Sequence, residues 1–238
     1  MIRRTWSVAL VLAAAGMLGG ASAQAGIVFY DTFKVATYTQ LSNAQPSVPA
    51  GYFGTVGVSA SLPGDLSGGN VTSVSPLSPM TLTGSNGNYS FGTPFVGSKA
   101  ALDADLPNGT IYTYNLTGGT FNGQSATLAT PASDEYAGTV PFFTGSTYNA
   151  LQGLNPSTAI NLTFNTYGTP PGVNTPLTFI GITQVSNSQF VYGTSGDNTL
   201  NSATVPGGTL LPNTQYDLDI VFRRPAGITI PASWSFLA

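Results

Sequence analysis

Carboxylates are the side chains with the most catalytic potential in this sequence. The chain has no His and no Cys, which excludes Ser-His-Asp and Cys-His catalysis, His-ligated zinc and thiolate metal sites. It also has no Gly-x-Gly-x-x-Gly or Walker-type loop, so a nucleotide site is not indicated. The carboxylates that remain are Asp31, Asp65, Asp103, Asp105, Asp134, Glu135, Asp197, Asp217 and Asp219.

One pair of these carboxylates has the spacing that glycoside hydrolysis requires. Asp217 and Asp219 alternate with apolar residues over 216–222, which is typical of a strand with one face toward a core. They would lie about 7 Å apart on the other face, and a glycosidase uses two carboxylates about 5 to 9.5 Å apart. The competing interpretation is a solvated strand face. We expect the solvated face, and therefore predict no catalytic residue and no cofactor.

Two further acidic pairs contain the hard oxygen ligands that Ca²⁺ prefers. These pairs are Asp103-x-Asp105 and Asp134-Glu135. Neither pair has the spacing of an EF-hand loop or of an RTX repeat. We therefore predict no metal site.

Aromatic residues near turns indicate a second kind of site, because exported sandwiches often stack aromatic rings on sugars. The candidate glycan contacts are Trp234, Tyr192 and Tyr167. Burial in a core is the commoner fate of aromatic residues. Carbohydrate binding is thus an alternative function here, and extracellular polysaccharide is a candidate partner.

The charge pattern excludes two classes of partner. Charged residues are 6% of the chain, against about 25% in an ordinary soluble protein. Without the leader described below, the cations are Lys34, Lys99, Arg223 and Arg224. Four scattered cations cannot neutralise a nucleic-acid backbone or attach the protein to anionic lipid. Hydrophobic residues are 42% of the chain, enough to build a core without disulfides.

The first 25 residues have the three-part pattern of a signal peptide. Arg3 and Arg4 precede an apolar run over 7–18, and small residues follow it up to Ala25. An uncleaved membrane anchor is the alternative, but the run is shorter than the roughly 20 residues that span a bilayer. We expect cleavage before Gly26, a secreted or cell-surface protein, and no transmembrane segment in the mature chain.

Beyond the leader, the hydrophobic period is two, so the fold class is all-β. Turn-forming residues bound each strand-like run, as strands require. Helical patterns are confined to 98–105 and 146–152, with Gly153 as the C-cap of the second. The expected strands include 27–30, 111–116, 160–164, 179–182, 190–192 and 216–222.

A repeated turn indicates how the strands are organised. Leu106–Tyr112 and Leu211–Tyr216 both lead from a Leu-Pro-Asn turn into a strand with a Tyr at its start. Immunoglobulin-like sandwiches have such a tyrosine corner, whose hydroxyl bonds nearby backbone. We therefore predict structural tyrosine corners at Tyr112 and Tyr216. Two sandwich units, immunoglobulin-like or jelly-roll, would cover 26–132 and 133–238, and one larger jelly roll is the alternative.

Several short motifs follow one another in a characteristic order. They are Ala101-Leu102-Asp103, Leu106–Tyr112, Val140–Thr144, Ala150–Ser157, Asn161–Asn165 and Gly208–Tyr216. Their order resembles that in exported bacterial proteins of the PEP-CTERM sorting type. The C-terminus differs from that class, because residues 230–238 contain no Pro-Glu-Pro signal, apolar span or basic tail. The resemblance implies a β-sandwich protein of a cell surface or extracellular matrix.

These observations together predict a secreted, non-enzymatic protein that is a structural or adhesive component of a bacterial surface or matrix. Extracellular polysaccharide and other surface proteins are the expected partners. A carbohydrate-binding module is the alternative function, and a carboxylate-dependent glycosidase is the third.

Overall fold

The computed structural model describes residues 27–133, 139–168 and 177–223. Within them the fold is all-β, as predicted, with antiparallel sheets and a few short helices. The chain forms two compact units. We call the described part of 12–37 and 49–136 the N-terminal unit, and that of 38–48 and 137–225 the C-terminal unit.

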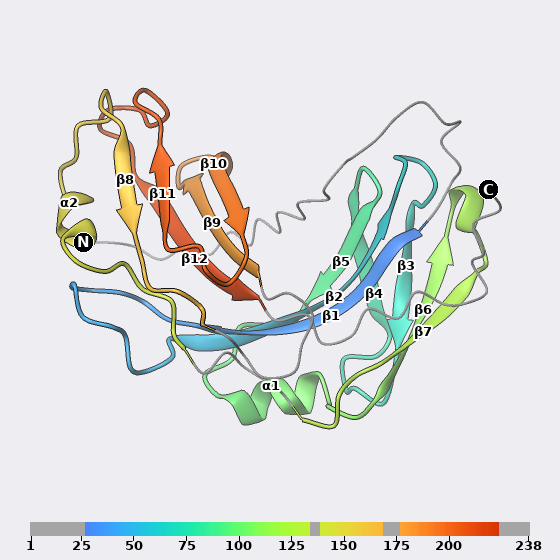
Figure 1. Ribbon diagram of the computed structural model, residues 1–238. Coiled ribbons are helices and arrows are strands. Elements are labelled where there is room, and N and C mark those ends of the chain that lie inside the picture. Colours follow the sequence, from blue (N-terminus) through green and yellow to red (C-terminus); the bar gives the residue numbers. More distant parts are fainter. Residues whose placement is uncertain (1–26, 134–138, 169–176, 224–238) are drawn as a thin grey trace. The chain divides into compact units, whose positions relative to one another are not determined.

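The strands of the N-terminal unit form one antiparallel sheet with the order β1-β2-β5-β4-β3-β6-β7 (Figure 1). Alternating apolar residues put one face of this sheet on the core. The outer face is covered by Thr, Asn and Ser, as in the cross-strand row Ser125, Asn115, Asn70 and Thr81. The strands are β1 (Ile27–Thr37), β2 (Gly51–Ala60), β3 (Gly68–Thr72), β4 (Met80–Ser85), β5 (Asn88–Gly92), β6 (Ile111–Thr117) and β7 (Ser125–Ala129).

Contacts between distant strands show that this sheet folds over its own core. The Tyr114 hydroxyl of β6 donates to the backbone carbonyl oxygen of Asp31 in β1 at 2.5 Å. Its ring meets that of Tyr30 edge to face, with centroids 5.0 Å apart. Burial raises the pKa of Tyr114 well above its ordinary value. The two ends of the sheet therefore pack as the layers of a sandwich.

A short helix covers part of β2. α1 (Lys99–Asp105) begins at Ser98, whose side chain accepts a hydrogen bond from the Ala101 amide. Leu102 and Leu106 are fully buried above Gly54, where a Cβ would lie 2.4 Å from a methyl group of Leu106. Because Gly54 has no side chain, Leu102 and Leu106 can pack directly against β2.

The C-terminal unit has two smaller sheets, with the orders β10-β9-β12 and β11-β8 (Figure 1). Their facing sides share an apolar core that includes Leu162, Phe164, Ile180 and Val205. α2 (Thr147–Ala150) lies before β8. The strands are β8 (Ile160–Thr163), β9 (Leu177–Gln184), β10 (Gln189–Gly196), β11 (Ser202–Val205) and β12 (Tyr216–Arg223).

One segment of the C-terminal unit comes from the long connection between β1 and β2. Within it, the Gln40 side-chain amide bonds both backbone groups of Phe143, with its oxygen 2.7 Å from the amide nitrogen and its nitrogen 2.9 Å from the carbonyl oxygen. Phe143 also forms a β-bridge with Phe164. The units therefore differ from the predicted ranges 26–132 and 133–238, because 38–48 groups with the later part of the chain.

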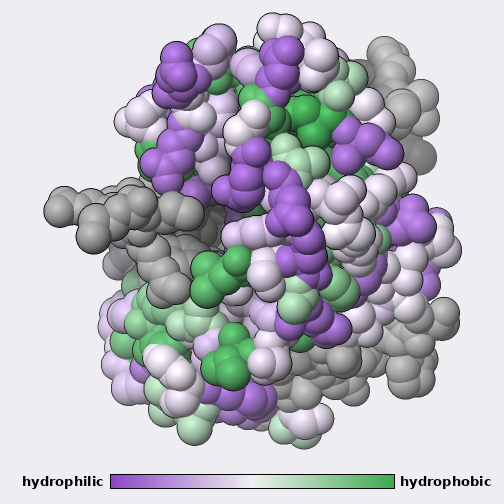
Figure 2. All heavy atoms as spheres, turned by 90° about the vertical axis from the view of Figure 1, so that its left-hand side faces the viewer, coloured by the Kyte–Doolittle hydropathy of each residue, from purple (hydrophilic) through white to green (hydrophobic). Residues whose placement is uncertain are grey.

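The surface carries few charges. In the view of Figure 2, hydrophobic residues form small separate patches among polar ones. No helix within the described ranges is long and apolar enough to cross a membrane. The predicted leader, Trp234 and the C-terminal residues 224–238 lie outside the described residues.

Candidate functional site

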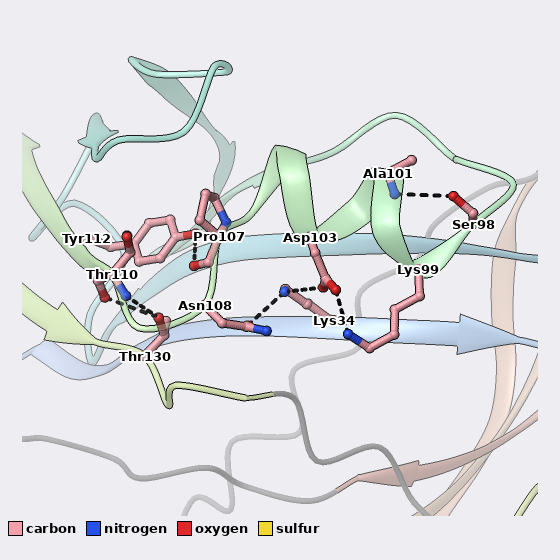
Figure 3. A network of polar contacts seen from close by, with 10 residues as sticks. All are labelled: Lys34, Ser98, Lys99, Ala101, Asp103, Pro107, Asn108, Thr110, Tyr112 and Thr130. Atoms are coloured by element: carbon pink, nitrogen blue, oxygen red, sulfur yellow. Dashed lines mark hydrogen bonds and ion pairs between the residues drawn. The ribbon is translucent and has the colours of Figure 1, made fainter.

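Both predicted tyrosine corners carry a hydrogen bond to the backbone five residues upstream. The fully buried Tyr112 donates its hydroxyl to the carbonyl oxygen of Pro107 at 3.3 Å (Figure 3). The half-buried Tyr216 accepts a hydrogen bond from the Leu211 amide at 2.8 Å. Each bond lies within one unit and ties the Leu-Pro-Asn turn to the strand that follows. These tyrosines are therefore structural residues and leave the site to be sought elsewhere.

Asp103 also has a structural role, because its carboxylate forms two ion pairs within the N-terminal unit. Its two oxygens lie 2.7 Å from Lys34 Nζ and 2.5 Å from Lys99 Nζ (Figure 3). Lys34 Nζ also donates to Asn108 Oδ1 at 2.8 Å. Because the Lys34 side chain is only 10% exposed, Asp103 supplies the counter-charge that a nearly buried ammonium needs. The network binds α1 to β1.

No group of three or more Asp or Glu within the described residues is placed to hold a metal ion. Of the two pairs considered for Ca²⁺, Asp103-x-Asp105 has its first carboxylate on two lysines. The other pair, Asp134-Glu135, lies outside the described residues.

The outer face of the β10-β9-β12 sheet carries aromatic rings, glycines and carboxylates, unlike the polar outer face of the seven-stranded sheet. Strand pairing places nine of its residues in three cross-strand rows. We call this surface the Phe-Gly face. Its rows are Phe190, Thr183 and Asp217; Gly193, Gly181 and Asp219; and Ser195, Phe179 and Val221.

Two aromatic rings lie over the glycines in the middle row. The rings of Phe179 and Phe190 have centroids 6.3 Å apart and planes inclined by only 17°. A Cβ on Gly181 would lie 2.9 Å from the first ring and 3.2 Å from the second, and one on Gly193 would lie 2.3 Å from Phe190. The two glycines thus form a floor against which the two nearly parallel rings pack as a strip.

This strip stands apart from the hydrophobic core. Ile180 and Ile182 of β9 point into the core, so Phe179 and Gly181 between them point outward. Phe190 is 37% exposed and Val221 is 38% exposed. Apolar surface of this kind on an outer sheet face is typical of a binding site.

Asp217 and Asp219 lie along one side of the strip, on the β12 strand. Both side chains are exposed, and neither forms an ion pair with any residue that the structure describes. Nearby protein atoms remove part of the water around Asp217 and raise its pKa. The pKa of Asp219 is raised by the same desolvation and then by the charge of Asp217. Within the described residues, the two carboxylates are thus charges without an ion-pair partner beside an apolar surface.

The aromatic residues that the sequence offered as glycan contacts have other positions. Tyr167 is 4% exposed and stacks on Phe222 with centroids 5.0 Å apart. Tyr192 packs against the core of the C-terminal unit, and its hydroxyl donates to the Thr204 carbonyl. Both tyrosines therefore have structural contacts, and Trp234 lies outside the described residues.

Sequence reasoning missed Phe179 and Phe190 as site residues. The available signal was in β9, where Phe179-Ile180-Gly181-Ile182 is apolar at both parities. A strand that is apolar on both faces has either two cores or one core and a binding surface. The sequence alone did not indicate which face Phe190 occupies. A bulge between it and Tyr192 turns these two residues to opposite faces of the sheet.

No protein-family model matches this chain, and no curated protein matches it.

Proposed function

We propose that this protein is an exported, non-enzymatic adhesive or structural component of a bacterial surface or extracellular matrix, and that it binds polysaccharide through the Phe-Gly face. The observation that carries this proposal is the strip of the half-buried Phe179 and the exposed Phe190 on its glycine floor, beside Asp217 and Asp219. The leader pattern, the low charge and the resemblance to PEP-CTERM-type proteins support the location.

The Phe-Gly face has the chemistry that a sugar chain requires. One face of a pyranose ring presents C–H groups, which are desolvated favourably against an aromatic ring. Because Gly181 and Gly193 have no side chains, the two rings can pack directly against the sheet and present their outer surfaces to a ligand. The carboxylates of Asp217 and Asp219 accept hydrogen bonds, and sugar hydroxyls are donors. A chain lying across the strands would thus meet rings and acceptors together.

The same carboxylates fit binding better than glycoside hydrolysis. Asp217 and Asp219 are at positions i and i+2 of β12, so they emerge on the same side of one strand. A glycosidase holds the bond to be cleaved between its acid and its base or nucleophile. Binding also accounts for Phe179 and Phe190, whereas hydrolysis does not require them.

A glycan-binding measurement tests the proposal. The mature protein and the double variant Phe179→Ala/Phe190→Ala should be compared on a panel of extracellular polysaccharides. We expect the mature protein to bind, and the double variant to bind at least about 5-fold more weakly, since each ring contributes about 0.5 to 1.5 kcal/mol. Ile111→Ala is the control, because Ile111 is 61% exposed and lies in the N-terminal unit. Equal binding by the double variant would contradict the proposal.

A further inference from the structure

The Phe-Gly face is negatively charged as well as aromatic. Arg223 is the one cation in the sequence ranges 38–48, 139–168 and 177–223, which also contain Asp197, Asp217 and Asp219. β9 and β10 contain no charged residue. Arg223 is four residues beyond Asp219 on β12, a separation of roughly 14 Å along an extended strand. Among the described residues, the charged groups in the three rows of the Phe-Gly face are therefore Asp217 and Asp219.

We infer that the ligand of the Phe-Gly face is a polysaccharide with free amino groups, whose ammonium ions bind Asp217 and Asp219 while a sugar ring stacks on Phe179 and Phe190. This inference rests on the proposed function and narrows it to one class of sugar. Charge complementarity supports it, because two carboxylates with no ion-pair partner among the described residues, at an apolar surface, attract a cation that can shed part of its water.

The strand register places the acidic and aromatic groups within reach of one amino sugar. Asp219 lies directly across from Gly181, over which both rings rest. Directly opposed residues on neighbouring strands have Cβ positions about 5 Å apart. An amino sugar over the rings would thus bring its ammonium group close to Asp219. An ammonium ion is also attracted by the face of an aromatic ring.

The same charges disfavour other sugars. A uronic acid would place its carboxylate beside Asp217 and Asp219, and like charges at this distance repel. An N-acetylated sugar has the same ring and loses only the positive charge. Comparison of these three sugar types therefore separates the contribution of charge from that of stacking.

Binding of three oligosaccharide series to the mature protein tests the inference. The probes are oligomers of glucosamine, N-acetylglucosamine and galacturonate, at a pH where the amines are protonated and the carboxylates ionised. We expect glucosamine oligomers to bind at least about 10-fold more tightly than their acetylated forms, and this preference to weaken with added salt. Galacturonate oligomers should bind most weakly.

Two charge variants assign the preference to its residues. Asp217→Asn/Asp219→Asn should bind the glucosamine and N-acetylglucosamine series equally. Asp105→Asn instead removes a charge from α1 of the N-terminal unit and should keep the preference. Equal binding of both series by the unaltered protein, or a preference that survives in Asp217→Asn/Asp219→Asn, would overturn the inference and leave the proposed function standing. Failure to bind any glycan would overturn both.

Discussion

Carboxylates have two kinds of environment in this protein, which has few charges. One is that of Asp103 in the N-terminal unit, and the other is that of Asp217 and Asp219 in the C-terminal unit. Asp103 contacts two lysines and has its charge compensated within the fold. Asp217 and Asp219 have no such partner among the described residues and lie beside exposed aromatic rings. The first arrangement stabilises the fold, whereas the second leaves interactions to be made with a ligand.

The outer sheet faces differ in the same way. The seven-stranded sheet presents small polar side chains, among which Asn115 donates to Asn70 at 3.0 Å. Polar side chains on this face therefore bond one another, as Asn115 and Asn70 do. The Phe-Gly face exposes rings, glycines and carboxylates instead. A solvated face and the proposed binding face thus differ in the kinds of side chain that each exposes.

Removal of the Asp103 charge should have the largest effect on stability. Asp103→Asn leaves the nearly buried ammonium of Lys34 without its carboxylate, so we expect the N-terminal unit to lose about 2 to 3 kcal/mol, less than a fully buried pair because Asp103 keeps solvent contact. Urea unfolding measures this loss. Asp105→Asn is the control on the same helix and should cost less than about 0.5 kcal/mol. Equal costs at the two positions would show that the network adds no stability.

The two tyrosine corners should differ in their contributions to stability. Tyr112→Phe leaves the Pro107 carbonyl without this partner in a partly buried setting, so it should cost about 1 to 2 kcal/mol. Tyr216→Phe frees the Leu211 amide near solvent and should cost about 0.5 to 1 kcal/mol. Because the tyrosines lie in separate compact units, each variant should lower one of two calorimetric transitions. A single transition lowered by both variants would show that the units unfold together.

The pH dependence of stability should distinguish two carboxylates of the C-terminal unit. The raised pKa of Asp219 means that the folded unit binds this proton more tightly than the unfolded chain does. Its contribution to stability is therefore greatest at low pH and is lost as the pH rises through the raised pKa. Hydrogen bonds from the Thr199 hydroxyl and amide lower the pKa of Asp197, whose contribution is present at neutral pH and lost on acidification.

Variants separate these two contributions. Compared with the unaltered protein, Asp219→Asn should be slightly more stable at neutral pH than at acidic pH. Asp197→Asn should be slightly less stable at neutral pH than at acidic pH. Both effects should be smaller than those at the tyrosine corners, since these carboxylates contact solvent. Thermal unfolding between acidic and neutral pH measures the two slopes. Slopes of the same sign would contradict the assignment of the shifts.

Chelators should have the smallest effect of all. The acidic pairs Asp103-x-Asp105 and Asp134-Glu135 lack a calcium-loop spacing, so EDTA should leave the unfolding midpoints unchanged within error. Added Ca²⁺ should likewise have no effect. A drop of several degrees in EDTA that Ca²⁺ alone reverses would show that one of the units holds a metal ion.

The elements predicted from sequence are those with strong local signals. The structure has both predicted helices, and α1 begins after its predicted cap Ser98. The predicted C-cap Gly153 was wrong, because α2 ends at Ala150 with Leu151 as its C-cap. The alternation of apolar and acidic residues predicted β12, and β-branched or aromatic runs predicted β6, β8, β9 and β10. Short-range periodicity and capping were sufficient there, because neighbouring residues alone decide these patterns.

The glycine-rich strands β3 and β4 were not predicted. Gly69 and Gly84 have little intrinsic strand preference, yet tertiary packing requires them. A Cβ at Gly69 would lie 2.4 Å from the Asn115 carbonyl oxygen, and one at Gly84 would lie 2.0 Å from that of Asn88. Glycine is required at both positions because the neighbouring strand approaches too closely for a side chain. This requirement depends on tertiary contacts, so no local sequence pattern indicates it.

The candidate site was predicted only in part, for a related reason. The sequence placed Asp217 and Asp219 on one strand face correctly. Their aromatic neighbours come from β9 and β10, so the pairing register decides which residues meet them. The bulge after Phe190 then decides which face its ring occupies. Register and bulges are tertiary features, and a single sequence does not contain them in readable form.

The most direct test of the binding face is a nuclear magnetic resonance titration of the mature protein with a polysaccharide oligomer that it binds. The amide signals of Gly181 and Gly193 report on the floor beneath the rings, and those of Asn70 and Asn115 report on the polar face of the N-terminal unit. The account predicts that the glycine signals shift in a saturable manner while the asparagine signals stay in place. Shifts confined to Asn70 and Asn115 would contradict it.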